Sequence, residues 1–224
     1  MFSRIAERYD LMNSIMTAGQ DRRWRREIVR RAAIPQDGWL LDLGTGTGRL
    51  AQEALSQHPT GHIVAADFTL DMMLAGKKQL IPNPSMRQLV SWCAADAACL
   101  PFPDQTFDAV ISGFLLRNVV DLQQCLAAQF RVLKPGGRIV ALDTTPPQRS
   151  LFSPFTRFYF RKVVPNMGKL IAGNPVDYEY LSVSTEKFLP PEKLALTMTQ
   201  AGFQEVEFRQ RMFGTIAIHW GRRP

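Results

Sequence analysis

The chain contains a short apolar run that leads into a loop with glycine at every second position. Leu40–Leu43 has the character of a buried strand, and Gly44, Gly46 and Gly48 follow it directly. Glycine lets a backbone turn sharply and approach a ligand closely, because it has no Cβ. A helical pattern begins at Leu50, and the first amides of a helix point toward the same place as the loop. The segment therefore predicts a strand–turn–helix unit that binds a nucleotide-sized ligand.

The spacing of these glycines separates two kinds of ligand. A dinucleotide fingerprint has glycine at its first, third and sixth positions, whereas Arg49 occupies the sixth position here. The loop instead alternates glycine with other residues, and Asp42 precedes it within the strand. A carboxylate at that position can hold the ammonium group of S-adenosylmethionine (SAM), directly or through water. The loop thus favours SAM over a nicotinamide dinucleotide.

Two further acidic residues follow predicted strands. Asp67 ends the apolar run that starts at His62, and Asp96 ends the run that starts at Val90. In parallel βαβ units such acids lie beside the glycine loop, where Asp67 can accept hydrogen bonds from both ribose hydroxyls of an adenosine. Asp96 is then placed for the adenine amino group, with the Ala97 amide donating to the ring. The alternatives are a helix N-cap for Asp67 and a solvated loop aspartate for Asp96.

The spacing of apolar residues predicts alternating helices and strands. Asp121 is expected to cap one helix, Lys134–Gly137 to stop it, and Gly202 to cap the last helix. The pattern implies an α/β, Rossmann-like fold of the class I SAM-dependent methyltransferase type, with a mainly parallel seven-stranded sheet and helices on both faces. We expect one domain over 1–224, with an N-terminal helical cap over 1–36 and a substrate-side insertion over 144–190. The predicted helices are 4–17, 20–33, 70–80, 122–133 and 191–201, and the predicted strands are 39–43, 62–66, 90–94, 107–112, 138–143 and two more at the end of the chain.

Composition and charge restrict the class further. The chain has 224 residues, 46% of them hydrophobic, which is enough to bury a single core. No apolar run approaches the length of a bilayer span, and the cysteines and histidines show no metal-ligand spacing, so we expect no metal and a cytoplasmic protein. The net charge is +7, with six arginines in residues 22–31. We expect an amphipathic helix there, whose basic face is solvated, meets anionic lipid or, least favoured, meets nucleic acid.

Several motifs along the chain resemble those of the quinone-biosynthesis C-methyltransferases, which include the menaquinone and ubiquinone methyltransferases. The Lys-Pro-Gly-Gly and Pro-Phe-Pro-Asp segments support only the methyltransferase superfamily, whereas Tyr9–Asn13 and Leu116–Val119 are specific to the quinone branch. The resemblance runs from Phe2 to about Arg223. It implies that SAM methylates a ring carbon of a reduced, prenylated quinol. The supporting motifs are Phe2–Asn13, Arg23–Arg26, Asp42–Leu50, Leu100–Asp104, Leu116–Val119, Phe130–Gly137 and Ala201–Phe203.

The resemblance also implies site residues. Its SAM contacts correspond to Thr47, Asp67, Asp96, Ala97 and Gly113, to which the loop analysis adds Asp42, Gly44 and Gly46. Two departures bear on the pocket. Gly113 stands where family members often have serine, and Leu115 replaces a glycine.

Methyl transfer from a sulfonium requires mainly that the acceptor carbon be positioned in line. Loss of the neighbouring hydroxyl proton makes that carbon a better nucleophile, so a group that steadies a phenolate is useful. We expect Arg117 and Asn118 to act in catalysis, and Tyr9, Asp10 and Tyr178 to bind substrate. The alternative for Arg117 is a structural ion pair with an acid such as Asp121 or Asp143.

The expected partner is a lipophilic quinol, with transient contact of basic and aromatic segments with a membrane surface. The enzyme would then be peripheral at the inner face of the plasma membrane or at an organelle membrane. The aromatic residues within 151–160 suit either a channel for a prenyl tail or ordinary core. A homodimer is left open, as are a different small-molecule acceptor and a non-catalytic SAM-binding assembly partner. A nucleic-acid methyltransferase is disfavoured, because no Asn/Asp-Pro-Pro-aromatic motif follows the fourth strand.

Overall fold

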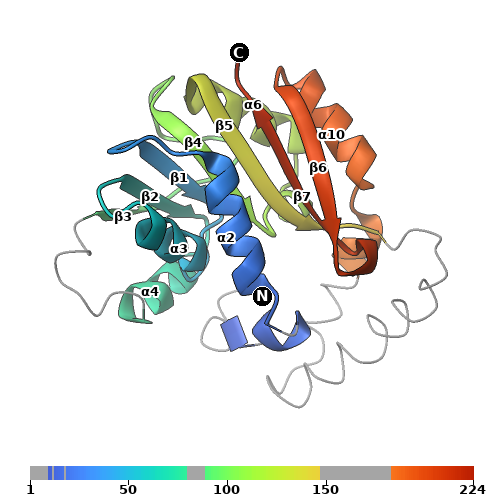
Figure 1. Cartoon of the computed structure of the whole chain (residues 1–224), viewed down its shortest axis with the longest axis horizontal. Helices are drawn as coiled ribbons and strands as arrows, with labels where there is room; N and C mark the ends of the chain where they lie inside the picture. Colours follow the sequence, from blue (N-terminus) through green and yellow to red (C-terminus); the bar gives the residue numbers. More distant parts are fainter. Residues whose placement is uncertain (1–9, 12, 18, 80–88, 147–182) are drawn as a thin grey trace.

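The computed structural model describes residues 10–11, 13–17, 19–79, 89–146 and 183–224 (Figure 1). Tyr9, Tyr178 and the aromatic residues within 151–160 lie outside them. In chain order, the elements are α2 (Asp21–Ala32), β1 (Trp39–Leu43), α3 (Arg49–Gln57), β2 (His62–Asp67), α4 (Leu70–Gln79), β3 (Val90–Ala94), β4 (Phe107–Gly113), the 3-10 turn η1 (Leu116–Asn118), α6 (Leu122–Val132), β5 (Leu133–Thr144), α10 (Pro191–Gln200), β6 (Gln204–Arg211), the 3-10 turn η3 (Met212–Gly214) and β7 (Ile216–Arg222).

The described strands form one seven-stranded sheet in the order β3-β2-β1-β4-β5-β7-β6. Strands β1 to β5 pair in parallel, and β7 runs antiparallel to both β5 and β6. The carboxyl ends of β1, β2, β3 and β4 therefore meet at one edge of the sheet. The strand order reverses direction around β1 and β4, which is where open α/β sheets bind their ligands.

Both faces of the sheet are covered, and the pleat of β1 shows how. Leu41 and Leu43 point into a core shared with α6 and α10, whereas Leu40 points into a second core shared with α2 and α3. Figure 1 shows α2 and α3 in front of the sheet. Burial on both faces explains why the inner strands β1, β2 and β4 are almost continuously apolar rather than alternating. The predicted α/β architecture is confirmed.

Three local predictions can be compared with the structure. The arginine-rich segment forms α2, which buries Trp24 and Ile28 against the sheet and leaves four of its six arginines exposed. Asp121 caps α6 by accepting a hydrogen bond from the Gln124 amide at 2.9 Å. The fifth strand begins earlier than predicted, because Leu133 already pairs with Phe107 and a bulge before Ala109 absorbs the Lys134–Gly137 turn. Among the described residues, no helix is long and apolar enough to cross a membrane.

Candidate SAM and acceptor site

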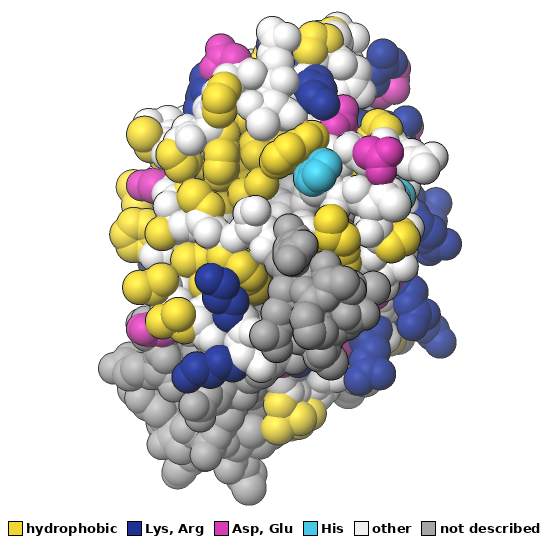
Figure 2. Space-filling view, turned by 90° about the vertical axis from the view of Figure 1, so that its left-hand side faces the viewer, with side chains coloured by type: hydrophobic (Ala, Val, Ile, Leu, Met, Phe, Trp, Pro, Cys, Tyr) yellow, Lys and Arg dark blue, Asp and Glu magenta, His cyan; other side chains and the backbone are white. Residues whose placement is uncertain are grey.

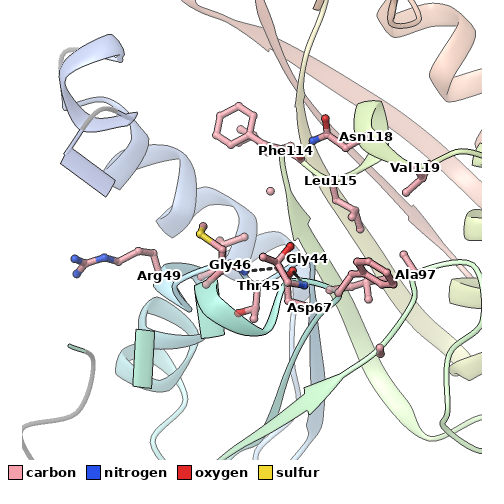
Figure 3. A pocket seen from close by; sticks show the side chains of 18 of the residues that line it. Gly44, Thr45, Gly46, Arg49, Asp67, Ala97, Phe114, Leu115, Asn118 and Val119 are labelled. Carbon is pink, nitrogen blue, oxygen red and sulfur yellow. Dashed lines mark hydrogen bonds between the residues drawn. The ribbon is translucent and has the colours of Figure 1, made fainter. Parts of the chain in front are cut away.

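A cavity of about 630 Å³ opens at the carboxyl edge of the sheet, between the glycine loop, α2 and the ends of β2, β3 and β4 (Figure 3). Within the described residues, most of the predicted site residues meet there, and three do not. Asp42, Thr47 and Arg117 are absent from its walls. The predicted residues that line it are Asp10, Gly44, Gly46, Asp67, Asp96, Ala97, Gly113 and Asn118.

The glycine loop is held in a conformation that other residues tolerate poorly. Gly44 has φ +69°, and a Cβ on it would lie 2.9 Å from the Leu115 Cδ1. On its other side the loop touches α4, because a Cβ on Gly76 would lie 2.5 Å from the Thr47 carbonyl oxygen. Gly76 thus allows a helix to support the loop backbone directly. The sequence analysis missed this residue, since a helix-interior glycine carries no signal of its own apart from its low helix propensity.

Asp67 lies three residues before α4 and is not its N-cap, and its carboxylate accepts hydrogen bonds from two backbone amides. Its Oδ2 accepts a hydrogen bond from the Gly46 amide at 2.7 Å, and its Oδ1 accepts one from the Thr69 amide at 2.7 Å. The second bond is the turn that opens α4, and the first ties the carboxylate to the glycine loop (Figure 3). Each carboxylate oxygen has two lone pairs, so one acceptor site on each oxygen is left for a ribose hydroxyl. The ribose role stays a prediction that this geometry fits.

The part of the cavity beside Asp96 and Ala97 suits an adenine. Asp96 is exposed, and its Oδ1 accepts a hydrogen bond from the Ala98 amide at 2.8 Å, which fixes the carboxylate beside Ala97. Val119 and Val120 contribute apolar surface to the same end. Apolar surface beside an exposed carboxylate can take a base and accept a hydrogen bond from its amino group. The described residues therefore fit SAM: the ends of β2 and β3 would hold its nucleoside, and the glycine loop would hold its amino-acid end.

Asp42 is the first correction to the predicted site. It is fully buried below the glycine loop, and its Oδ2 accepts hydrogen bonds from the Thr45 hydroxyl at 2.6 Å and the Ala51 amide at 2.9 Å. Burial raises the pKa of this carboxyl to about 7, although both hydrogen bonds oppose the shift. A group without exposed surface does not touch the SAM ammonium directly. Asp42 instead connects the loop to the first turn of α3.

This burial predicts a pH dependence of stability. Between pH 4 and 7 the folded chain keeps the Asp42 proton that the unfolded chain has lost, so this carboxyl's contribution to stability falls as pH rises through that range. The total is about 4 kcal/mol from a shift of roughly three pKa units. We expect Asp42→Asn to remove this slope, because an amide oxygen still accepts both hydrogen bonds. Urea unfolding of both proteins from pH 4 to 8 checks this, and parallel pH profiles would contradict it.

Thr47 is the second correction, because its side chain faces the N-terminal segment. Its hydroxyl donates to Asp10 Oδ1 at 2.7 Å, and Arg49 Nε donates to Asp10 Oδ2 at 2.8 Å. Asp10 lies on the cavity wall with both carboxylate oxygens engaged. Arg49, whose position disfavours a dinucleotide, therefore has a structural role: it links Asp10 to the glycine loop.

Arg117 is the third correction. Its side chain is 3% exposed, and its guanidinium donates to Asp143 Oδ1 at 2.5 Å while its own amide donates to Asp143 Oδ2 at 3.1 Å. The geometry favours the structural ion pair, with Asp143 as partner rather than Asp121. Asn118 does line the cavity, and its amide nitrogen donates to the Phe114 carbonyl at 2.7 Å. No group of three potential metal ligands occurs among the described residues.

The fold is shared with solved structures of SAM-dependent methyltransferases. The chain superimposes on phosphoethanolamine N-methyltransferase 2 of Haemonchus contortus in complex with SAM with a TM-score of 0.68, at 15% identity over 90% of this chain and 52% of that one. A SAM-dependent methyltransferase from Aquifex aeolicus gives a TM-score of 0.62 at 16% identity over 89% of each chain. The chain therefore shares the fold of SAM-dependent methyltransferases.

Sequence comparison gives the family. The model of the ubiE/COQ5 methyltransferase family matches residues 1–223, and the chain belongs to this family. It is 48% identical, over 99% of its length and 88% of the relative's, to the ubiquinone/menaquinone biosynthesis C-methyltransferase UbiE of Desulfotalea psychrophila. It is 43% identical, over the full length of both chains, to the demethylmenaquinone methyltransferase of Thermus thermophilus. SAM is accordingly its cofactor and methyl transfer its reaction.

Proposed function

We propose that the chain methylates a ring carbon of a prenylated quinol, either demethylmenaquinol to menaquinol or the related benzoquinol or phytyl-naphthoquinol step. The full-length similarity to UbiE and to demethylmenaquinone methyltransferases carries this proposal. The cavity supports it, because its acceptor end is walled by Trp24, Ile28, Phe114 and Leu142, which suit an apolar ring. Polar side chains that line the cavity from α2, η1 and the chain before α2 include Asp10, Asn13, Asp21, Arg25 and Asn118.

Bound SAM supplies an electrophilic methyl group on a sulfonium. The glycine loop and Asp67 hold the donor, and the apolar wall holds the acceptor ring and keeps water away from it. Positioning of this kind accounts for most of the work that methyl transfer asks of a protein. No histidine lines the described cavity, so the proton of the quinol hydroxyl leaves to water or to the Asp10 carboxylate.

The test is transfer of labelled methyl from SAM to defined acceptors by the purified protein. Demethylmenaquinol, kept reduced, is compared with a demethylated benzoquinol and with the oxidised quinones. We expect label in a reduced quinol and none in the oxidised forms. Label in a different small molecule would favour the alternative acceptor. Tight SAM binding with no transfer to any acceptor would favour the assembly partner.

We further propose that the lipophilic acceptor reaches the cavity from a membrane surface. Arg22, Arg23, Arg26 and Arg30 are all exposed on α2, the helix whose other side walls the cavity. Exposed Phe68 at the cavity supplies apolar surface. Figure 2 shows the side of the molecule at the β3 edge, with Lys and Arg side chains gathered along its right-hand border. Sedimentation with anionic but not zwitterionic vesicles is expected, and equal sedimentation with both would contradict it.

A further inference from the structure

Phe114 has an unusual backbone conformation at the end of β4. Its φ is +62°, in the left-handed region that bulky side chains rarely adopt. Such strain persists only where the surrounding structure fixes it, and it gathers at functional sites. The residue next to it, Gly113, would take this conformation at little cost. The presence of phenylalanine at this positive φ therefore needs a physical explanation.

Three contacts fix Phe114 in place. Its amide donates to the Leu142 carbonyl at 2.7 Å, and its carbonyl accepts from the Asn118 side chain at 2.7 Å. The Arg117 guanidinium carbon lies 4.9 Å from the centre of its ring. Arg117 is itself anchored by the buried ion pair described above. Both residues predicted to be catalytic thus contact Phe114, and the turn η1 acts as its support.

The ring of Phe114 belongs to the acceptor end of the cavity. It is half-buried against the core that includes Ile28 and Leu142, and it lines the cavity with them. In Figure 3 it stands apart from Asp67 and Ala97, which mark the nucleoside end. Phe114 is only partly buried and lines the same cavity as the glycine loop, so its ring can offer a planar surface to a second planar group. Aromatic pairs prefer offset stacked or edge-to-face geometry, which orients one ring relative to the other.

We propose that Phe114 is the platform on which the aromatic ring of the acceptor stacks, and that it sets the preference for aromatic over saturated acceptors. The proposal rests on the proposed function in one respect, that the acceptor carries an aromatic ring. It explains why the strained conformation is retained, since the strain aims the ring into the cavity. In this proposal, η1 positions the Phe114 ring and does not transfer a proton.

The experiment measures binding of two probes to the protein loaded with S-adenosylhomocysteine. One probe is 1,4-dihydroxynaphthalene, and the other is its saturated analogue decahydronaphthalene-1,4-diol. We expect Phe114→Leu, which keeps an apolar side chain, to lower the affinity for the aromatic probe about tenfold. The affinity for the saturated probe should fall less than twofold. Phe114→Tyr should restore the aromatic preference. SAM affinity should stay within about twofold in both variants.

The matched control is Phe208→Leu, which removes a ring that stacks on His219 away from the cavity. This control should leave the affinities for both probes unchanged. Equal weakening of the two probes by Phe114→Leu, or no weakening of either, would overturn the platform. Loss of SAM affinity in parallel would assign Phe114 to the donor end instead. A wild-type protein that prefers the aromatic probe but methylates no quinol would overturn the proposed function and leave the platform standing.

Discussion

Asp67→Ala is expected to weaken SAM binding by about 100-fold. Hydrogen bonds to a charged acceptor contribute about 1.5–3 kcal/mol each, so the loss of two ribose contacts at the lower end of that range already corresponds to roughly this factor. The substitution also removes the acceptor of the Gly46 amide, which sets the position of the glycine loop. Titration calorimetry with SAM and S-adenosylhomocysteine measures the change.

The matched control for this variant is Asp71→Ala. Asp71 is an exposed aspartate in the first turn of α4, four residues further along the chain and outside the cavity walls. It should leave SAM affinity unchanged, and thermal unfolding of both variants separates lost binding from lost folding. Unchanged affinity in a folded Asp67→Ala protein would remove the ribose role and leave Asp67 as the residue that opens α4.

The order of elements was predictable because it depends on local signals. The apolar runs, the glycine loop and the caps at Asp121 and Gly202 lie within a few residues of the structure they specify, and these strands and helices appear within a residue or two of their predicted bounds. The predicted start of β5 was wrong because it depends on a contact that is distant in sequence. Leu133 joins the strand because it pairs with Phe107, a residue far from it in sequence.

The partners of the site side chains could not be predicted in the same way. Asp42, Thr47 and Arg117 have the expected polar groups, but each group bonds to another part of the protein. The Thr47 hydroxyl meets Asp10, 37 residues away, and the Arg117 guanidinium meets Asp143, 26 residues away. Nothing local distinguishes a carboxylate that faces a ligand from one that faces the core. The left-handed backbone of Phe114 likewise has no local signal, since its cause is the set of contacts around it.

The Arg117–Asp143 pair should be among the most sensitive points of the fold. Both side chains are almost fully buried, at 3% and 2% exposure, and Asp143 accepts further hydrogen bonds from the amides of Arg117 and Thr144. Removal of one partner from a buried pair leaves an uncompensated charge and costs about 3–5 kcal/mol. We expect Asp143→Ala to lose stability by this amount in urea unfolding. A loss below about 1 kcal/mol, typical of exposed pairs, would show that the pair is not sealed from water.

The double variant Arg117→Met with Asp143→Leu separates the structural role of Arg117 from a catalytic one. Two apolar side chains of similar size can replace a buried ion pair with little change in stability, or with a gain. The double variant should therefore recover most of the stability that Asp143→Ala loses. If Arg117 only supports η1 and Phe114, the folded double variant keeps a measurable turnover number, and its main defect is a higher KM for the acceptor. If Arg117 steadies a phenolate, turnover collapses while SAM affinity and stability stay normal. The contacts of Arg117 favour the first outcome, because its guanidinium faces Asp143 and the Phe114 ring rather than the cavity.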